Sequence, residues 1–189
     1  MKLKLSFLVI VLFFSIKGFA SYILIPMDAE SQAEHLKAYG ITYWVLEKQV
    51  KAKWLLNYRG GSFLLPDAEE IRKECQIRGV SFEVISDAQT NQILEDISSP
   101  SQNMEAVVLE KAPRIAVYSP KGNQPWDDAV TMVLTYAEIP YTVVYDEEVL
   151  SDQLLLYDWL HLHHEDFTGQ YGKFYRAYRS APWYIEQKR

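Results

Sequence analysis

Short apolar runs alternate with amphipathic segments from residue 21 to residue 111. The apolar runs read SYILIPM, VKAKWLLNY, VSFEVIS and MEAVVLE, and each has the length and the flanking polar or turn residues of a strand. Between these runs, DAESQAEHLKAYGITYWVLEKQ, PDAEEIRKECQIRG and DAQTNQILEDI carry apolar residues at helical spacing. Alternating strands and helices are typical of an α/β protein, so we predict a mostly parallel sheet with flanking helices.

The alternation starts again at Ala112-Pro113. RIAVYSP and YTVVYD read as strands, with the helical segment QPWDDAVTMVLTYAEI between them. LLLYDWLHLHH is a strand, or a short helix that leads into one. We place a domain boundary near Lys111, which gives an N-terminal α/β region over 21–111 and a second α/β domain over 112–189.

Two adjacent glycines mark a turn in NYRGGSF, between the apolar segments KWLLNY and SFLL. Gly60 and Gly61 permit positive φ, so the stretch predicts a tight hairpin. The alternative is that Arg59 binds a carboxylate or a phosphate. The stretch lacks the Lys and the following Ser or Thr of a phosphate-binding loop.

The first 20 residues have the three parts of a secretory signal peptide. Lys2 and Lys4 precede an apolar run from Leu5 to Ile16, and a small-residue exit predicts cleavage near Ala20/Ser21. The run is too short for a membrane-spanning helix, which needs about 20 residues, although a retained anchor is the alternative. We therefore expect an exported protein, periplasmic or secreted, without a stable membrane anchor.

The charge balance argues against nucleic-acid binding. The whole chain has a net charge of −6. The residues after position 20 include 16 basic and 25 acidic side chains. No basic stripe is left to neutralise phosphates, so no nucleic-acid partner is expected. The 13 Tyr and 5 Trp residues either fill a large core or form a surface for a ligand such as a sugar.

Two polar segments follow predicted strands of the second domain, SPKGNQPWDDA and HLHHEDFTGQYG. In an open parallel sheet, ligands bind outside the carboxyl ends of the strands. If the two strands are parallel neighbours, both segments lie at one edge of the sheet. We predict that a small polar ligand of the sugar or amide class binds there through Lys121, Asn123, Trp126, Asp127, His163 and Glu165.

Three histidines lie close together in HLHH. On a strand, His161 and His163 share one face, while Leu162 and His164 share the other. The histidines could pack in the sheet and bond loop backbone, bind substrate or transfer protons, or ligate a metal with Glu165. No second ligand set has recognisable spacing, so we expect no metal and no cofactor.

The mature chain resembles an exported bacterial family whose members are often catalogued as asparagine synthetase B. The resemblance is carried by YILIPMDAESQAEHLKAYGITYWVLEKQVKAKWLLNYRGGSFLLPDAEEIRKECQIRGVSFEVIS, KAPRIAVYSPKGNQPWDDAVTMVLTYAEIPYTVVYDEEVL and YDWLHLHHEDFTGQYGKFY. It implies that this chain is the N-terminal part of a longer protein. It also implies that Arg114 opens a class I glutamine-amidotransferase-like (flavodoxin-like) domain, which is incomplete at Arg189.

ATP-dependent asparagine synthesis does not fit the residues. A glutamine-hydrolysing asparagine synthetase uses an N-terminal Cys nucleophile and a Ser-Gly-Gly-rich ATP loop. Here Lys2 follows the initiating Met, cleavage would expose Ser21, and no such loop occurs. The single Cys75 lies in a helical pattern without a neighbouring base, so we predict a core or groove residue rather than a nucleophile.

Two functions stay open. The first is a ligand-binding or scaffold role at the carboxyl ends of the strands. The second is an amide (glutamine-type) or glycoside hydrolase, or an amidotransferase, whose active site is completed beyond Arg189. Asp127 or Asp128 with Glu165 would then be the acid and base. We assign no catalytic residue and no oligomeric state, and we expect a chain ending at Arg189 to associate through an uncovered sheet edge.

Overall fold

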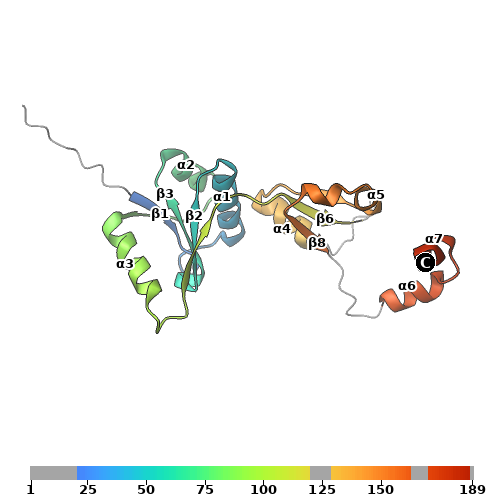
Figure 1. Cartoon of the computed structure of the whole chain (residues 1–189). Helices are drawn as coiled ribbons and strands as arrows, with labels where there is room; N and C mark the ends of the chain where they lie inside the picture. Colours follow the sequence, from blue (N-terminus) through green and yellow to red (C-terminus); the bar gives the residue numbers. More distant parts are fainter. Residues whose placement is uncertain (1–20, 120–128, 163–169, 188–189) are drawn as a thin grey trace, which may run out of the picture.

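Two β-sheets organise the chain, as Figure 1 shows. The structure is a computed structural model, and it describes residues 21–119, 129–162 and 170–187. The main sheet contains β1 (Ser21–Ile25), β2 (Ala52–Leu56), β3 (Ser62–Pro66), β4 (Glu83–Ser86) and β5 (Glu105–Leu109), and the small sheet contains β6 (Ile115–Tyr118), β7 (Thr142–Val144) and β8 (Trp159–Leu162). The helices are α1 (His35–Glu47), α2 (Glu69–Ile77), α3 (Asp87–Ser98), α4 (Ala129–Ala137), α5 (Asp146–Leu150), α6 (Gln170–Tyr178) and α7 (Pro182–Gln187), with the short 3-10 helices η1 (Tyr58–Gly60) and η2 (Gln153–Leu156).

The main sheet is antiparallel, so the prediction of a mostly parallel sheet was wrong. Its strand order is β4-β1-β3-β2-β5, and every neighbouring pair runs antiparallel. The tight β2–β3 hairpin, which the paired glycines predicted, places β3 between β1 and β2. The elements β1, α1, β2, β3, α2 and β4 therefore form a split βαβ (β-α-β-β-α-β) unit, and β5 extends the sheet beside β2.

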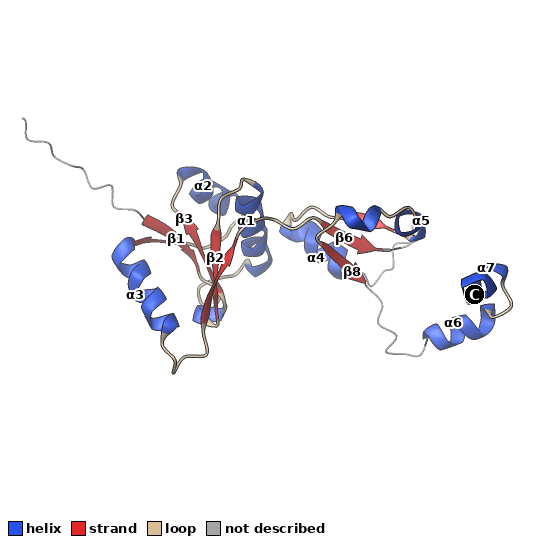
Figure 2. Cartoon of the chain, in the orientation of Figure 1, coloured by secondary structure: helices blue, strands red, loops and turns tan. Residues whose placement is uncertain are grey.

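Helices cover both faces of the main sheet, which explains why the strand direction was mispredicted. On one face, Ile23, Ile25 and Leu65 pack with residues of α1 and α2. On the other face, Leu24 and Leu64 pack against α3. Figure 2 shows α3 on the opposite side of the sheet from α1 and α2. Because both faces of the inner strands β1 and β3 are buried, these strands are almost continuously apolar, a pattern more common in parallel sheets.

The small sheet is parallel, with the order β7-β6-β8. Its central strand packs Ile115 and Val117 against Leu134 of α4. The predicted mostly parallel fold leading into a flavodoxin-like unit is replaced by a five-stranded antiparallel sheet followed by this three-stranded parallel one.

Helix α4 also packs against α1 and so connects the two sheets. A Cβ atom added to Gly40 of α1 would lie 1.8 Å from the carbonyl oxygen of Ala137, so the two backbones touch there. The Tyr136 hydroxyl donates to Glu34 at 2.6 Å, and Lys37 pairs with Glu138 at 2.5 Å. Both interactions reinforce the same contact.

Helices α6 and α7 lie apart from both sheets in Figure 1. They contact each other through aromatic rings, with centroid distances of 5.5 Å for Tyr175 and Tyr184 and 6.2 Å for Tyr178 and Trp183. Within the described residues, none of the helices combines the length and the apolar character that crossing a membrane requires. The predicted signal peptide lies outside the described residues, so the predicted export stays a prediction.

Candidate functional site

The carboxyl ends of the three parallel strands meet at one edge of the small sheet. Tyr118 of β6 is in register with Val144 of β7 on one side and with Leu162 of β8 on the other. The arrows of β6 and β8 point away from the main sheet in Figure 1. We call the described part of this edge, Tyr118, Ser119, Tyr145, Asp146 and Leu162, the carboxyl edge. It is the position at which open parallel sheets bind ligands.

Two tyrosines and one carboxylate interact at the carboxyl edge. The Tyr118 hydroxyl donates to Oδ1 of Asp146 at 2.5 Å. The rings of Tyr118 and Tyr145 lie 5.3 Å apart at an interplanar angle of 37°. The N–H of the buried Ser119 donates to the carbonyl of Val144 at 2.9 Å. These contacts fix the positions of the edge side chains relative to the sheet.

The described part of the carboxyl edge carries negative charge. Helix α5 begins with Asp146, Glu147 and Glu148, whose charges are favourable at a helix N-terminus. Glu148 also accepts a hydrogen bond from the Tyr145 N–H at 2.9 Å. Carboxylate acceptors beside aromatic rings suit a neutral ligand that carries hydroxyl or amide donors.

All six predicted ligand-binding residues lie outside the described residues, because they fall within 120–128 and 163–169. These residues are Lys121, Asn123, Trp126, Asp127, His163 and Glu165. The prediction required the strands before the two segments to be parallel neighbours. β6 and β8 are parallel neighbours and end in register. The two segments therefore start from the same edge of the sheet, and the participation of their side chains stays a prediction.

His161 is the one histidine of the HLHH cluster that lies within the described residues. It is half-buried on β8, and its ring lies edge-on to that of Trp159 at a centroid distance of 6.2 Å. Among the described residues, no group of three His, Cys, Asp or Glu side chains could hold a metal ion. The role of the histidine cluster stays a prediction, because His163 and His164 lie outside the described residues.

Sequence reasoning missed Tyr118, Tyr145 and Asp146. Each tyrosine lies at or just after the end of a strand, in the stretches VYS and VYD. This repeated pattern was a usable signal, because residues at strand carboxyl ends are the first candidates for binding in a parallel sheet. The Tyr118–Asp146 hydrogen bond joins residues 28 positions apart, so it could not be anticipated without the strand pairing.

Arg59 has a structural role. It lies in the left-handed region, at φ 44°, within the turn between β2 and β3. Its guanidinium donates to Asp28 at 3.1 Å, to Glu83 at 2.9 Å and to the Ser31 hydroxyl at 3.0 Å. Its three donor nitrogens therefore bind groups of the chain itself, and the hairpin prediction is confirmed.

Cys75 is a core residue, as predicted. Its side chain is 0% exposed in the core between α2 and the main sheet. Burial raises the pKa of the Cys75 thiol to about 12, and the charge of Glu74 adds to the increase. The thiol therefore stays protonated near neutral pH, which argues against a nucleophilic role.

Comparisons of the chain with models of protein families, with curated proteins and with solved structures find no match. The candidate site therefore rests on its own geometry and chemistry.

Proposed function

We propose that the chain binds a small polar ligand, of the sugar or amide class, at the carboxyl edge of its parallel sheet. The observation that carries this proposal is the parallel pairing of β6 with both β7 and β8. This pairing brings the carboxyl ends of three strands to one edge of the sheet. Such an edge is where ligands bind in open parallel sheets.

The chemistry of the described side chains supports this ligand class. The rings of Tyr118 and Tyr145 offer apolar surface, and Asp146 offers acceptors for hydroxyl or amide N–H donors. The Tyr118 hydroxyl holds the Asp146 carboxylate in place, so part of the binding geometry exists before the ligand arrives.

The resemblance to exported proteins catalogued as asparagine synthetase B belongs to the same proposal. An exported protein of this kind would meet its ligand outside the cytoplasm. The carboxyl edge would then serve binding or scaffolding rather than ATP-dependent synthesis.

The proposal is tested by calorimetric titration of the chain with neutral monosaccharides, disaccharides and primary amides. We expect saturable binding of at least one of these compounds. Asp146→Asn should weaken it roughly tenfold, because a hydrogen bond to a charged acceptor is lost. Tyr118→Phe should weaken it by a smaller factor, because Asp146 loses the hydroxyl that positions it.

The matched control is Tyr22→Phe, which removes a hydroxyl from β1 of the main sheet. It should leave the affinity unchanged. Absence of binding to every compound would overturn the proposal, and so would binding that neither carboxyl-edge variant alters. Release of ammonia or of a cleaved sugar during the titration would instead favour the hydrolase alternative.

A further inference from the structure

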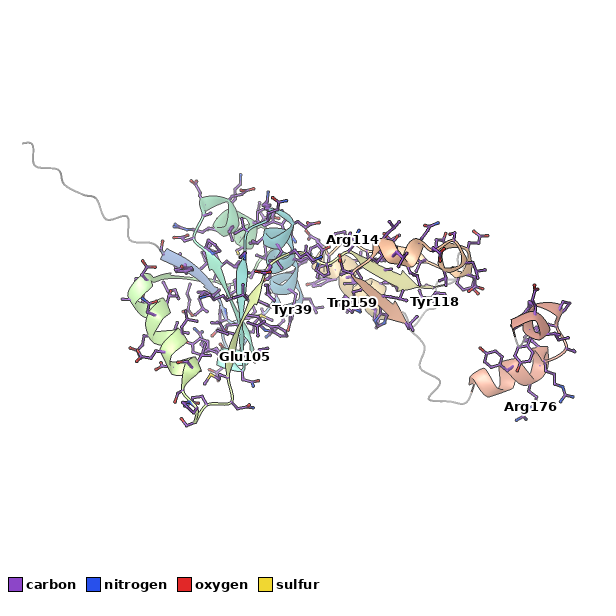
Figure 3. The ribbon with its side chains drawn as sticks, in the orientation of Figure 1. Tyr39, Glu105, Arg114, Tyr118, Trp159 and Arg176 are labelled. Atoms are coloured by element: carbon purple, nitrogen blue, oxygen red, sulfur yellow. The ribbon has the colours of Figure 1, made fainter. Side chains whose placement is uncertain are left out.

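A groove lies at the opposite edge of the small sheet, where its strands begin. This groove has a volume of about 340 Å³, at the lower end of the range of small-molecule sites. Its lining residues come from α1, from the amino ends of β6 and β7, and from the segment before β8: Tyr43, Glu47, Arg114, Ile115, Pro140, Tyr141, Thr142 and Tyr157. Figure 3 shows Arg114 between the two sheets and Tyr118 nearer the other end of the small sheet. The groove is therefore separate from the carboxyl edge.

Three tyrosines dominate the lining of the groove. The Tyr43 hydroxyl donates to the carbonyl of Pro113 at 2.8 Å, and the Tyr141 hydroxyl lies 3.2 Å from Oγ1 of Thr135. Both rings are therefore held by hydrogen bonds to the protein. Tyr157 is half-buried and completes the aromatic lining. Aromatic faces attract cations, and this attraction increases as water is excluded.

The positive charges near the groove are already engaged. Arg114 donates from Nε to Asp158 at 3.0 Å, and the backbone N–H of Arg114 donates to the same carboxylate at 2.9 Å. Lys111 reaches Asp158 at 3.0 Å from a side chain that is 75% exposed, so solvent screens its charge.

Glu47 is the one acidic residue in the groove lining, and within residues 21–119, 129–162 and 170–187 it has no counterion. Among the described residues, its carboxylate forms no hydrogen bond or ion pair, since the nearby Lys48 pairs with Glu70 and Lys51 pairs with Glu110. Glu47 is also the last residue of α1, where a negative charge is unfavourable because it adds to the negative end of the helix dipole. Glu47 therefore does not stabilise α1.

The electrostatics of Tyr43 agree with a negative potential in the groove. Burial, followed by the charges of Glu47 and Asp158, raises the pKa of the Tyr43 hydroxyl. The same charges would favour a bound cation.

We propose that this groove binds a small organic cation, with an ammonium or quaternary ammonium group between the Glu47 carboxylate and the tyrosine rings. Glu47 supplies the countercharge, and the rings of Tyr43, Tyr141 and Tyr157 supply the apolar and cation–π surface. A ligand here would contact α1 and the small sheet together, so its binding would also stabilise the contact between the two parts of the chain.

The test is an NMR titration of the ¹⁵N-labelled chain with choline and, in parallel, with 3,3-dimethylbutan-1-ol, its uncharged isostere. We expect choline to shift the amide signals of Glu47, Arg114 and Tyr141, with an affinity roughly tenfold above that of the isostere. Glu47→Gln should weaken choline binding roughly tenfold, and Tyr157→Leu should also weaken it. Glu95→Gln changes an exposed acid on α3 in the same way and should have no effect.

Three outcomes would overturn the proposal. They are equal affinity for choline and its isostere, undiminished choline binding in Glu47→Gln, and the absence of shifts in the groove at saturating choline. Because Glu47 and Glu95 are both exposed, neither substitution removes core packing, and a lost signal cannot be attributed to unfolding. The carboxyl-edge variants should leave choline binding unchanged, so the two proposed sites can fail independently.

Discussion

Gly40→Ala tests the contact between α1 and α4, on which the connection of the two sheets depends. The added methyl group would lie 1.8 Å from the Ala137 carbonyl oxygen and 2.9 Å from its carbonyl carbon. Both neighbours are backbone atoms, so the overlap cannot be relieved by rotating a side chain. Helix α4 must move away from α1, or α1 must bend.

Two opposing effects determine how much Gly40→Ala changes the free energy of unfolding. Replacing glycine by alanine inside a helix stabilises the helix by about 1 kcal/mol. Overpacking at a buried contact costs about 1–3 kcal/mol, and the upper end applies here because the clash involves backbone. The displacement also weakens the exposed pairs of Glu138 and Glu34, which are worth about 0–1 kcal/mol each. We expect a net loss of about 2–4 kcal/mol in the free energy of unfolding.

The measurement is urea-induced unfolding followed by circular dichroism and by tryptophan fluorescence. Gly172→Ala in α6 is the matched control, because nothing lies within 4 Å of a Cβ atom added there. The control should be neutral or stabilising by up to about 1 kcal/mol. If Gly40→Ala is as stable as the control variant, the close approach of α1 and α4 is refuted.

Three further predictions concern single side chains. Arg59→Lys keeps the charge but offers its N–H donors from a single nitrogen, whereas the guanidinium reaches Asp28, Glu83 and Ser31 from three separate nitrogens. The free energy of unfolding should therefore fall by about 1–3 kcal/mol in urea titrations, and an unchanged midpoint would show that the turn does not need the guanidinium. Cys75 should react with a thiol reagent at pH 8 only as fast as the chain opens, and rapid labelling of the native protein would contradict its burial. Hydrogen bonds from Arg114, followed by that from Lys111, lower the pKa of Asp158, so its contribution to stability is present above the ordinary Asp pKa of about 3.9 and is lost as the pH falls through the lowered value. Unfolding measured from pH 6 to pH 2 should therefore show a shallower loss of stability in Asp158→Asn than in the wild type, and parallel curves would count against the interaction.

The positions of most elements could be predicted from the sequence, because they depend on local periodicity. The strand predicted over 21–27 is observed as β1, and the segment LLLYDWLHLHH contains η2 followed by β8, as expected of a short helix leading into a strand. The hairpin at Gly60-Gly61 was equally local, since both glycines have positive φ and close the turn between β2 and β3.

Strand order and direction could not be predicted in the same way. The insertion of β3 between β1 and β2 is set by pairing between residues such as Ile25 and Phe63, which are far apart in the sequence. Apolar runs buried on both faces occur in parallel sheets and in helix-covered antiparallel sheets alike. The pattern therefore predicted burial correctly and direction wrongly.

For the candidate site, too, local features could be predicted, whereas features that depend on strand pairing could not. The sequence predicted that the segments after two strands share one edge, and the parallel register of β6 and β8 meets that condition. The strand-end stretches VYS and VYD were a local signal for Tyr118 and Tyr145, but the hydrogen bond between Tyr118 and Asp146 depends on the pairing of β6 with β7 and could not be predicted. Likewise, that Glu47 has no counterion among the described residues is visible only once Lys48 and Lys51 have been placed beside other acids.

The carboxyl edge is most directly tested by mapping a bound ligand on the assigned amide NMR spectrum of the chain. The same sugars and amides are titrated, and the residues whose signals shift are identified. Our account predicts saturable shifts at Tyr118, Ser119, Tyr145 and Asp146, with smaller effects in the main sheet. Shifts confined to the groove around Tyr43, or to no defined surface, would contradict it.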